Sequence, residues 1–288
     1  MIRLDYSFTA HLGPIYAISA FQEHLFSASG DQTVKKINLN SKSLEAFTVR
    51  CDSSPISLLA LTEQQLFVGL LNGSFFWINP ENKKIIFEYH FNGDTVFSMA
   101  SNAPKTLLFL GLSSGSLAIF DIENQEWLFM EAVAKDKIRT ILVHPFRPEI
   151  YLSSKDGHIV QFDLEVMKTK HKWPAHDFGA NALVFNSKNQ LVSGGKDGHL
   201  KSWDLKSRVL LRDIPAHRGT IYGLAIIGPK LISVSRDKSI KVWDDVLLNP
   251  LQKLTRHKQS VNALVQQNEY SFVTASDDHT LCFWNNEI

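Results

Sequence analysis

The chain repeats itself about every 41 residues, and this period excludes most folds at once. Seven short segments end in an aromatic or aliphatic residue followed by Asp or Asn, with spacings of 41, 42, 42, 41, 40 and 41 residues. They are Ile37-Asn38, Ile78-Asn79, Phe120-Asp121, Phe162-Asp163, Trp203-Asp204, Trp243-Asp244 and Trp284-Asn285. Seven such units account for all 288 residues, so the sequence predicts one repeat domain over residues 1–288, without a linker or a second domain.

Each unit has turn residues placed as in a small antiparallel sheet. A turn residue stands six positions before each segment end: Asp31, Asn72, Ser114, Asp156, Asp197, Asp237 and Asp278. Several of these begin Asn-Gly or Asp-Gly pairs, which suit a tight hairpin, and β-rich runs such as 231–234 and 240–243 flank them. We therefore expect four short strands per unit. Because one such sheet cannot cover both of its faces, the units should stack radially as the blades of an all-β, seven-bladed propeller.

The best-preserved unit carries a family resemblance. Residues 231–244, Leu-Ile-Ser-Val-Ser-Arg-Asp-Lys-Ser-Ile-Lys-Val-Trp-Asp, with Ala216-His217 before them, resemble a full WD40 repeat. Units five and seven are similar to it, whereas units two to four are recognised mainly by spacing. The resemblance implies a β-propeller that serves as a platform for protein interactions, usually without catalytic activity.

The strand count predicts how the last blade is completed. The segment 2–8 precedes the first strand of unit one, and the chain ends soon after the third strand of unit seven. Unit seven therefore lacks an outer strand, and the N-terminal segment is an unassigned strand of suitable length. Pairing the two would protect an exposed edge, as the family is known to do.

A recurring polar set has two interpretations. His217, Ser233 and Asp237 suggest a hydrolytic triad, but an equivalent set recurs in units five and seven, each time with a Trp at a fixed offset. A buried His that links the turn Asp, a strand hydroxyl and an indole N–H explains this repetition better. The predicted structural tetrads, which the resemblance also implies, are His176, Ser193, Asp197, Trp203; His217, Ser233, Asp237, Trp243; and His257, Thr274, Asp278, Trp284. Units two to four have Val68, Leu110 and Leu152 at the hydroxyl position, so apolar packing alone should hold them.

The resemblance also implies where a partner would bind, on the narrower face around the central channel. Its channel-lining positions fall on Tyr16, Ser57, Phe97, Arg139, Asn181, Tyr222 and Asn262. Around the mouth of the channel, the loop positions of units four to seven are basic apart from Asp177 and Asp277. The loop positions compared with them in units one to three are small or apolar and carry no charge. The residues predicted to contact a partner are Tyr16, Phe97, Lys135, Lys137, Arg139, Lys155, Asn181, Lys196, Arg218, Tyr222, Arg236, Lys258 and Asn262. A packed channel and a merely solvated lysine-rich surface remain the alternatives.

Composition limits the function classes. With 30 Lys and Arg against 29 Asp and Glu, a net charge of +1 gives no global attraction to nucleic acid or membrane. Two cysteines, no secretory signal and no spanning segment predict a cytoplasmic protein without membrane association, monomeric by itself. No metal-ligand spacing or nucleotide fingerprint predicts a cofactor. We expect a non-catalytic scaffold for an acidic partner protein or peptide. The alternative is a nucleic-acid-associated factor, concerned with RNA processing or ribosomes, that uses the basic half of the face.

Overall fold

A computed structural model describes residues 1–286, which form 28 strands in seven four-stranded antiparallel sheets. Each sheet is one blade, so the predicted all-β, seven-bladed propeller is confirmed. The last two residues of the predicted domain, 287–288, lie outside the described residues. The chain forms two compact units, residues 17–174 and residues 1–16 with 175–286, and each is described by itself.

Residues 17–174 hold blades one to four, and the first two residues of β2 belong to the other unit. Blade one consists of β2 (Ile15–Phe21), β3 (His24–Ser29), β4 (Thr33–Asn38) and β5 (Ser43–Arg50). Blade two consists of β6 (Pro55–Thr62), β7 (Gln65–Leu70), β8 (Ser74–Ile78) and β9 (Ile85–His90). Blade three consists of β10 (Val96–Ser101), β11 (Leu107–Leu112), β12 (Ser116–Asp121) and β13 (Glu126–Ala132). Blade four consists of β14 (Ile138–Val143), β15 (Glu149–Ser154), β16 (His158–Asp163) and β17 (Lys168–Pro174).

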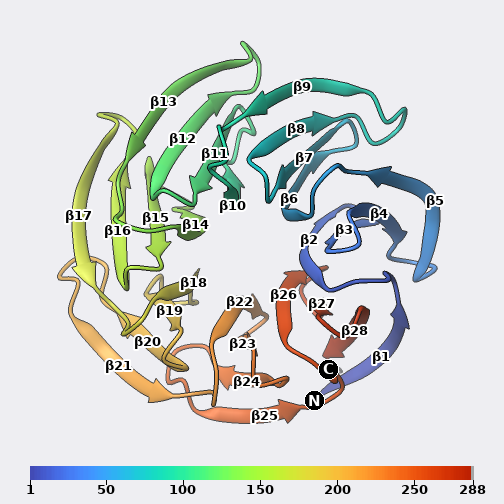
Figure 1. The fold of residues 1–288 in the computed structure, drawn as a ribbon. Helices are drawn as coiled ribbons and strands as arrows, with labels where there is room; N and C mark the ends of the chain where they lie inside the picture. Colours follow the sequence, from blue (N-terminus) through green and yellow to red (C-terminus); the bar gives the residue numbers. More distant parts are fainter. Residues whose placement is uncertain (287–288) are drawn as a thin grey trace. The chain divides into compact units, whose positions relative to one another are not determined.

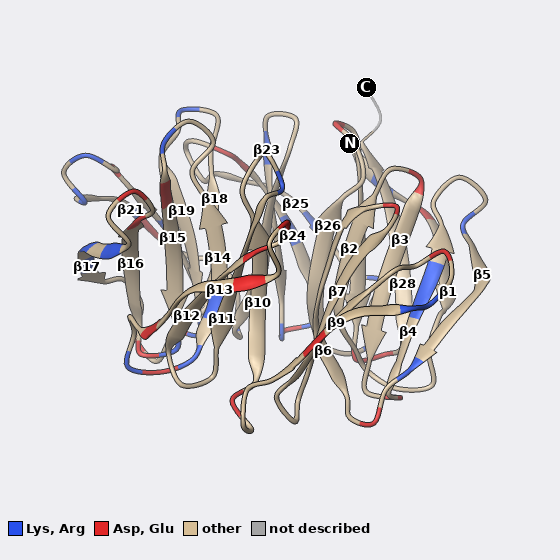
Figure 2. Cartoon of the chain, turned by 90° about the horizontal axis from the view of Figure 1, so that it is seen from above, with Lys and Arg blue, Asp and Glu red and all other residues tan. Residues whose placement is uncertain are grey.

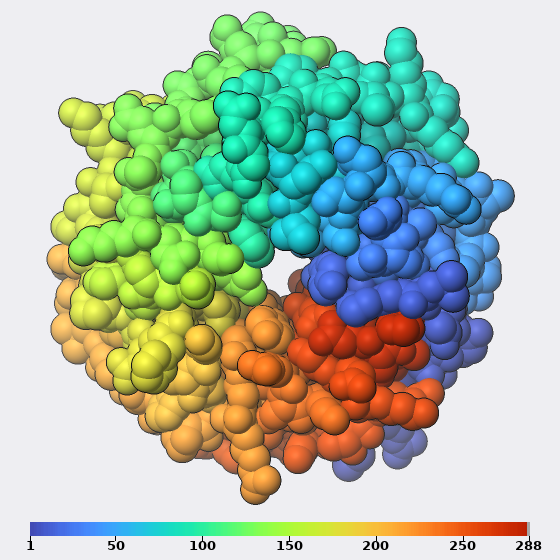
Figure 3. Space-filling view, in the orientation of Figure 1, coloured from blue at the N-terminus to red at the C-terminus, as the bar shows by residue number. Residues whose placement is uncertain are grey.

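The other unit holds blades five to seven. Blade five consists of β18 (Ala180–Phe185), β19 (Leu191–Gly195), β20 (His199–Trp203) and β21 (Leu210–Pro215). Blade six consists of β22 (Ile221–Ile227), β23 (Lys230–Ser235), β24 (Ile240–Asp244) and β25 (Pro250–Leu254). Blade seven consists of β26 (Val261–Gln266), β27 (Ser271–Ser276), β28 (Thr280–Asn286) and β1 (Ile2–Thr9). In Figure 3, residues 175–286 run from yellow through orange to red, and β1 is blue.

The N-terminal strand completes blade seven. β1 runs antiparallel beside β28, from Ile2 opposite Asn286 to Thr9 opposite Thr280 (Figure 1). The Gln252 side chain of blade six holds the start of β1, because its Oε1 accepts from the Ile2 amide at 3.0 Å and its Nε2 donates to the Ile2 carbonyl at 2.7 Å. The predicted pairing of the first strand with the last is confirmed.

The predicted turn residues shape every blade in the same way. In all seven blades the side-chain oxygen of the turn residue accepts a hydrogen bond from the amide two residues later, at 3.0–3.2 Å. This local hydrogen bond takes the place of a backbone hydrogen bond between strands where the chain reverses from the second strand to the third. The second strands, such as β15 and β27, are buried along their whole length, whereas the outer strand β9 is largely exposed. Burial on both faces follows from stacking blade on blade.

Blades two and three are packed by apolar side chains. Val68 and Leu110 are fully buried in the cores of these blades. Aromatic rings surround Trp127, with the Phe120 and Tyr89 centroids 4.8 and 4.9 Å from its ring. Apolar packing without a tetrad is what the sequence predicts for both blades.

Blade four differs from the prediction. Leu152 is buried as expected, but Glu149 at the start of β15 is also buried and accepts from Lys170 Nζ at 2.8 Å and Gln161 Nε2 at 3.0 Å. The expectation that apolar packing alone holds this blade is therefore wrong. Burial would raise the pKa of Glu149, but the hydrogen bonds from Lys170 and Gln161 outweigh it and lower the pKa.

Candidate partner-binding site

The tetrad of blade six joins two strands, a turn and a loop. His217 lies before β22, and its Nδ1 lies 3.0 Å from Asp237 Oδ2 in the turn after β23. Its Nε2 lies 2.7 Å from Ser233 Oγ, which accepts from the Trp243 indole at 2.9 Å. Each polar atom of the set thus has a partner in a setting where an unpaired one would be costly.

The pKa values agree with a neutral ring beside an ionised carboxylate. Burial lowers the pKa of His217 below its ordinary value. Burial would raise the pKa of Asp237, but hydrogen bonds, above all from Ser239, lower it to about 2. A neutral imidazole that donates from Nδ1 and accepts at Nε2 satisfies Asp237 and Ser233 together.

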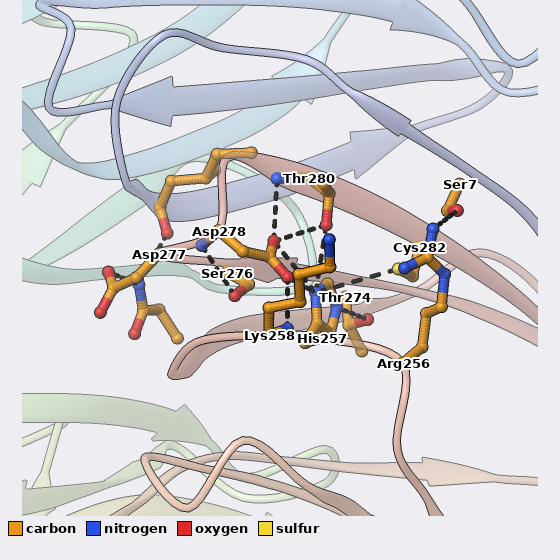
Figure 4. Close-up of polar contacts among 12 residues, drawn as sticks. Ser7, Arg256, His257, Lys258, Thr274, Ser276, Asp277, Asp278, Thr280 and Cys282 are labelled. Carbon is orange, nitrogen blue, oxygen red and sulfur yellow. Dashed lines mark hydrogen bonds and ion pairs between the residues drawn. The ribbon is translucent and has the colours of Figure 1, made fainter.

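Blades five and seven repeat this arrangement. His176 reaches Asp197 at 3.0 Å and Ser193 at 2.8 Å, and Trp203 donates to Ser193 at 2.9 Å. In blade seven, His257 reaches Asp278 at 3.1 Å and Thr274 at 2.8 Å, and Trp284 donates to Thr274 at 2.9 Å (Figure 4 draws the His257, Asp278 and Thr274 contacts). The structure thus brings together all twelve residues of the predicted tetrads, in three sets of four.

The tetrad carboxylates also hold the neighbouring loops. Asp237 Oδ2 accepts from the backbone amide of Arg218 at 3.1 Å, and Asp278 Oδ2 accepts from that of Lys258 at 2.7 Å (Figure 4). We call this end of blades five to seven, where the loops enter the first strands and the turns leave the second strands, the tetrad end. A buried network therefore fixes the backbone that presents its cations.

Four predicted cations gather in the loops of the tetrad end, and we call them the basic loop surface: Lys196, Arg218, Arg236 and Lys258. All four are exposed, and within residues 1–286 their side chains form no ion pair. Figure 2 colours the Lys and Arg residues of the chain blue. Asp277 in the same loops is already engaged, because its Oδ1 accepts from Asn262 Nδ2 at 2.7 Å.

Sequence reasoning missed a fifth cation at this end. Lys238 is exposed and follows Asp237 in the turn, with a positive φ of 71°. Gly157 and Gly198 occupy the same turn position in blades four and five. The signal was available, because a Lys stands where the repeat elsewhere has the Gly of an Asp-Gly pair.

An open depression lies within the basic loop surface. Its lining consists of Lys196, Arg218, Gly219, Thr220, Arg236 and Asp237, and its volume is about 350 Å³. The sequence predicts the charged members individually, but their meeting around one hollow depends on the packing of blade five against blade six.

Most of the predicted channel-lining residues lie at β-bulges. In each of blades three to seven, the register shifts near the start of the first strand, and the residue at the shift has no partner in the register. These residues are Phe97, Arg139, Asn181, Tyr222 and Asn262. A bulge re-aims the side chain it carries, so these residues leave the regular alternation of the strand. Tyr16 in β2 is 38% exposed, whereas Asn181 is buried. Asn262 has an internal role, because its amide also donates to the Ile15 carbonyl at 3.0 Å.

The placement of Ser57 among these positions is wrong. In blade two the bulge lies between Pro55 and Ser57, so Ile56 is the equivalent residue. Ser57 is buried, and its Oγ donates to the Val96 carbonyl at 2.6 Å. The repeat spacing varies between 40 and 42 residues along the chain, and a shift of one residue exchanges the two faces of a strand.

Blade four and the adjoining blade three carry a second basic cluster. Lys137 Nζ lies 4.4 Å from the centroid of the Phe97 ring, and Arg139 Cζ lies 5.3 Å from it. Burial, followed by the charges of Arg139 and Lys155, lowers the pKa of Lys137. Lys155 pairs with Asp136 at 3.3 Å, and Lys135 is exposed nearby in the chain. Phe97 is thus covered by cations rather than left open for an apolar ligand.

The loops of blades two and three are not uncharged. Asp94 accepts from Ser113 Oγ at 2.5 Å and from the Ser114 amide at 2.8 Å, and Asp52 accepts from Asn72 Nδ2 at 3.3 Å. The expectation of neutral loops is corrected here: these carboxylates tie the two loops of a blade together, as Asp237 does in blade six.

Comparison with known proteins now identifies the repeat. The family model described as "WD domain, G-beta repeat" matches residues 3–38, 167–204, 208–244 and 248–285, which is more than half of the chain. The chain belongs to the WD40 family. The matches cover the first three strands of blade one and of the tetrad blades five to seven, each together with the outer strand that precedes them in the chain. WD40 propellers generally act as protein-interaction scaffolds and are typically non-catalytic.

Two curated relatives share part of this WD40 chain. It is 33% identical over 122 residues to the human kinesin-like protein KIF21A, covering 41% of this chain and 7% of that protein. It is 31% identical over 115 residues to the mouse kinesin-like protein KIF21B, covering 39% of this chain and 7% of that protein. The chain thus spans a small fraction of the length of these relatives.

Within residues 1–286, no group of three His, Cys, Asp or Glu side chains is arranged to hold a metal ion. In the same part of the chain, no helix has the length and hydropathy needed to cross a membrane.

Proposed function

We propose that this WD40 chain is a non-catalytic scaffold that binds an acidic segment of a partner protein at the tetrad end of blades five to seven. The observation that carries the proposal is the basic loop surface, whose four exposed cations lack an ion pair within residues 1–286. Several like charges on one surface attract an acidic ligand and speed its encounter.

The loops that carry these cations are organised before any partner arrives. The backbone amides of Arg218 and Lys258 are held by the carboxylates of Asp237 and Asp278. Binding therefore orders side chains but little backbone, which reduces the entropy lost on association. A repeated buried network thus supports affinity at an exposed surface.

The tetrads support a scaffold rather than a hydrolase. Ser233 Oγ accepts from Trp243 and lies within hydrogen-bond distance of His217, so it is engaged inside the fold. Both Ser233 and Thr274 are fully buried, whereas a nucleophile needs an open position beside a reacting carbonyl. Three equivalent sets in three blades are the pattern of structural bonding.

The second basic cluster also suits an acidic ligand. Like charges crowd Lys137, and an anion bound there would relieve that repulsion.

A cytoplasmic location is part of the proposal. Cys51 and Cys282 are free thiols, as is common in a reducing compartment, and burial raises their pKa values to about 11 and about 12.

The test compares two double charge reversals of equal size in the same unit. Arg218→Glu with Arg236→Glu alters the basic loop surface, and Lys188→Glu with Lys206→Glu alters exposed lysines in the loops after β18 and β20. Affinity purification with mass spectrometry, after nuclease treatment, should find acidic partners with the full chain and the control pair but not with the first pair. Melting temperatures should stay within a few degrees.

Two outcomes contradict the proposal. Equal recovery of partners by both double variants would exclude the basic loop surface as the binding site. Loss of all captured proteins on nuclease treatment would favour the alternative, a nucleic-acid-associated factor, whose binding would also fall steeply with salt.

A further inference from the structure

The depression between blades five and six concentrates positive charge on one small hollow. Lys196 contributes from the loop after β19, Arg218 from the loop before β22 and Arg236 from the turn after β23. All three side chains are exposed and free of ion pairs within residues 1–286. Three cations around about 350 Å³ repel one another unless an anion lies between them.

The one carboxylate in the lining does not neutralise these cations. Asp237 accepts from Ser239 Oγ at 2.6 Å, from the Arg218 amide at 3.1 Å and from His217 Nδ1 at 3.0 Å. Its oxygens are directed into the tetrad and the turn, and it adds a single negative charge. The formal charge of the lining side chains is therefore +2, the complement of a dianion.

The lining also offers neutral donors. Gly219 and Thr220 belong to it, and within the described part of the chain no acceptor receives their backbone N–H groups. Thr220 is buried. Backbone N–H groups combined with guanidinium forks are the donors that phosphate oxygens prefer.

We propose that this depression binds the phosphate of a phosphorylated serine or threonine in the partner. The inference rests on the proposed function and specifies the acidic group that the basic loop surface takes. A phosphomonoester carries about −1.5 to −2 charges and three acceptor oxygens, whereas an Asp or Glu carboxylate carries one charge and two oxygens. The phosphomonoester therefore matches a lining with a charge of +2 more closely. A nucleic-acid backbone spreads single charges along a strand, which suits a long basic stripe rather than one hollow.

The experiment uses three short peptides of identical flanking sequence, Gly-Gly-X-Gly-Gly, in which X is phosphoserine, glutamate or serine. Titration into the full-length chain, followed by amide NMR shifts, should displace the Gly219 and Thr220 signals. The phosphoserine peptide should bind about tenfold more tightly than the glutamate peptide, and the serine peptide should not bind measurably.

Two matched variants locate the site. Arg236→Ala removes a cation from the lining, whereas Lys258→Ala removes an equally exposed cation outside it. We expect a loss of about tenfold for the first and less than about twofold for the second. Gly219→Ala changes no charge, but its Cβ would lie 3.3 Å from the Asp237 amide nitrogen and 3.4 Å from Arg236 Cβ, so it should narrow the hollow and weaken phosphopeptide binding.

The outcomes separate this inference from the proposed function. Equal affinity for the phosphoserine and glutamate peptides, or equal losses in Arg236→Ala and Lys258→Ala, would overturn the phosphate site. If captured partners still depend on Arg218 and Arg236 but survive phosphatase treatment, the proposed function holds and the phosphate site is wrong. Tighter binding of a single-stranded oligonucleotide than of the phosphoserine peptide would contradict both.

Discussion

His217 Nδ1 lies 3.0 Å from Asp237 Oδ2, and the same carboxylate oxygen accepts the backbone amide of Arg218 at 3.1 Å. One partly buried carboxylate thus stabilises blade six and fixes the loop that presents a cation of the basic loop surface. Fold stability and surface chemistry are coupled through Asp237, so variants must be designed to separate the two.

Replacing Asp237 by Ala should destabilise the protein by about 1–3 kcal/mol, because the buried His217 ring and the Arg218 amide lose their acceptor. Ser114→Ala changes the equivalent turn residue of blade three, which has no tetrad, and should cost far less. Urea unfolding of both variants measures the difference. Similar losses at the two positions would show that the tetrad does not stabilise blade six.

Stability should fall as the pH is lowered in two stages. The folded-state pKa of His217 is below its ordinary value of 6.5, so the unfolded chain binds more protons below that pH and the free energy of unfolding decreases. Asp237, with a pKa of about 2 against an ordinary 3.8, adds a loss as the pH falls from about 4 to about 2. Urea unfolding at several pH values measures this, and His217→Gln should flatten the profile between pH 7 and 5. An unchanged profile in that variant would contradict the assignment.

Deleting residues 1–9 should lower the melting temperature by roughly 10 °C or more, because β28 loses its outer partner strand and Ile2 leaves the core shared by blades six and seven. Gln252→Ala should weaken the attachment of β1 without removing the strand. It removes only the two hydrogen bonds to Ile2 and should lower the melting temperature by about 2–4 °C. A truncated chain that melts within a couple of degrees of the full one would exclude the role given to β1.

Lys238→Gly should separate stability from binding. Its φ of 71° costs an ordinary residue about 1–2 kcal/mol, and glycine removes that cost but loses about 0.5–1 kcal/mol through unfolded-state entropy. The free energy of unfolding should stay the same or rise by up to about 1.5 kcal/mol, whereas affinity for an acidic partner should fall. Lys238→Ala should lose affinity equally without the gain in stability. Wild-type affinity in both variants would remove Lys238 from the binding surface.

The tetrads illustrate how far residue patterns reach. Asp197 and Trp203 stand six residues apart, His176 precedes Asp197 by 21 residues, and these offsets recur in two other units to within one residue. Each set forms in the structure. Glu149 had no such signal, because its partners Gln161 and Lys170 belong to one blade only and have no counterparts at the repeat spacing. A network that occurs in one blade only cannot be recognised from the sequence repeat.

The sequence by itself determined the all-β class, the seven blades, the tetrads and the pairing of the N-terminal strand into the last blade. Each of these depends on local alternation, turn residues and a regular period. Only the tertiary structure decided that Ile56 rather than Ser57 lies in the bulge of blade two, and that Lys196, Arg218 and Arg236 line one depression. The physical reason is distance along the chain. Turn chemistry acts over a few residues. The bulge, in contrast, depends on how β6 pairs with β7, where Ser57 faces Gly69, and the depression depends on how loops some 20 to 40 residues apart pack.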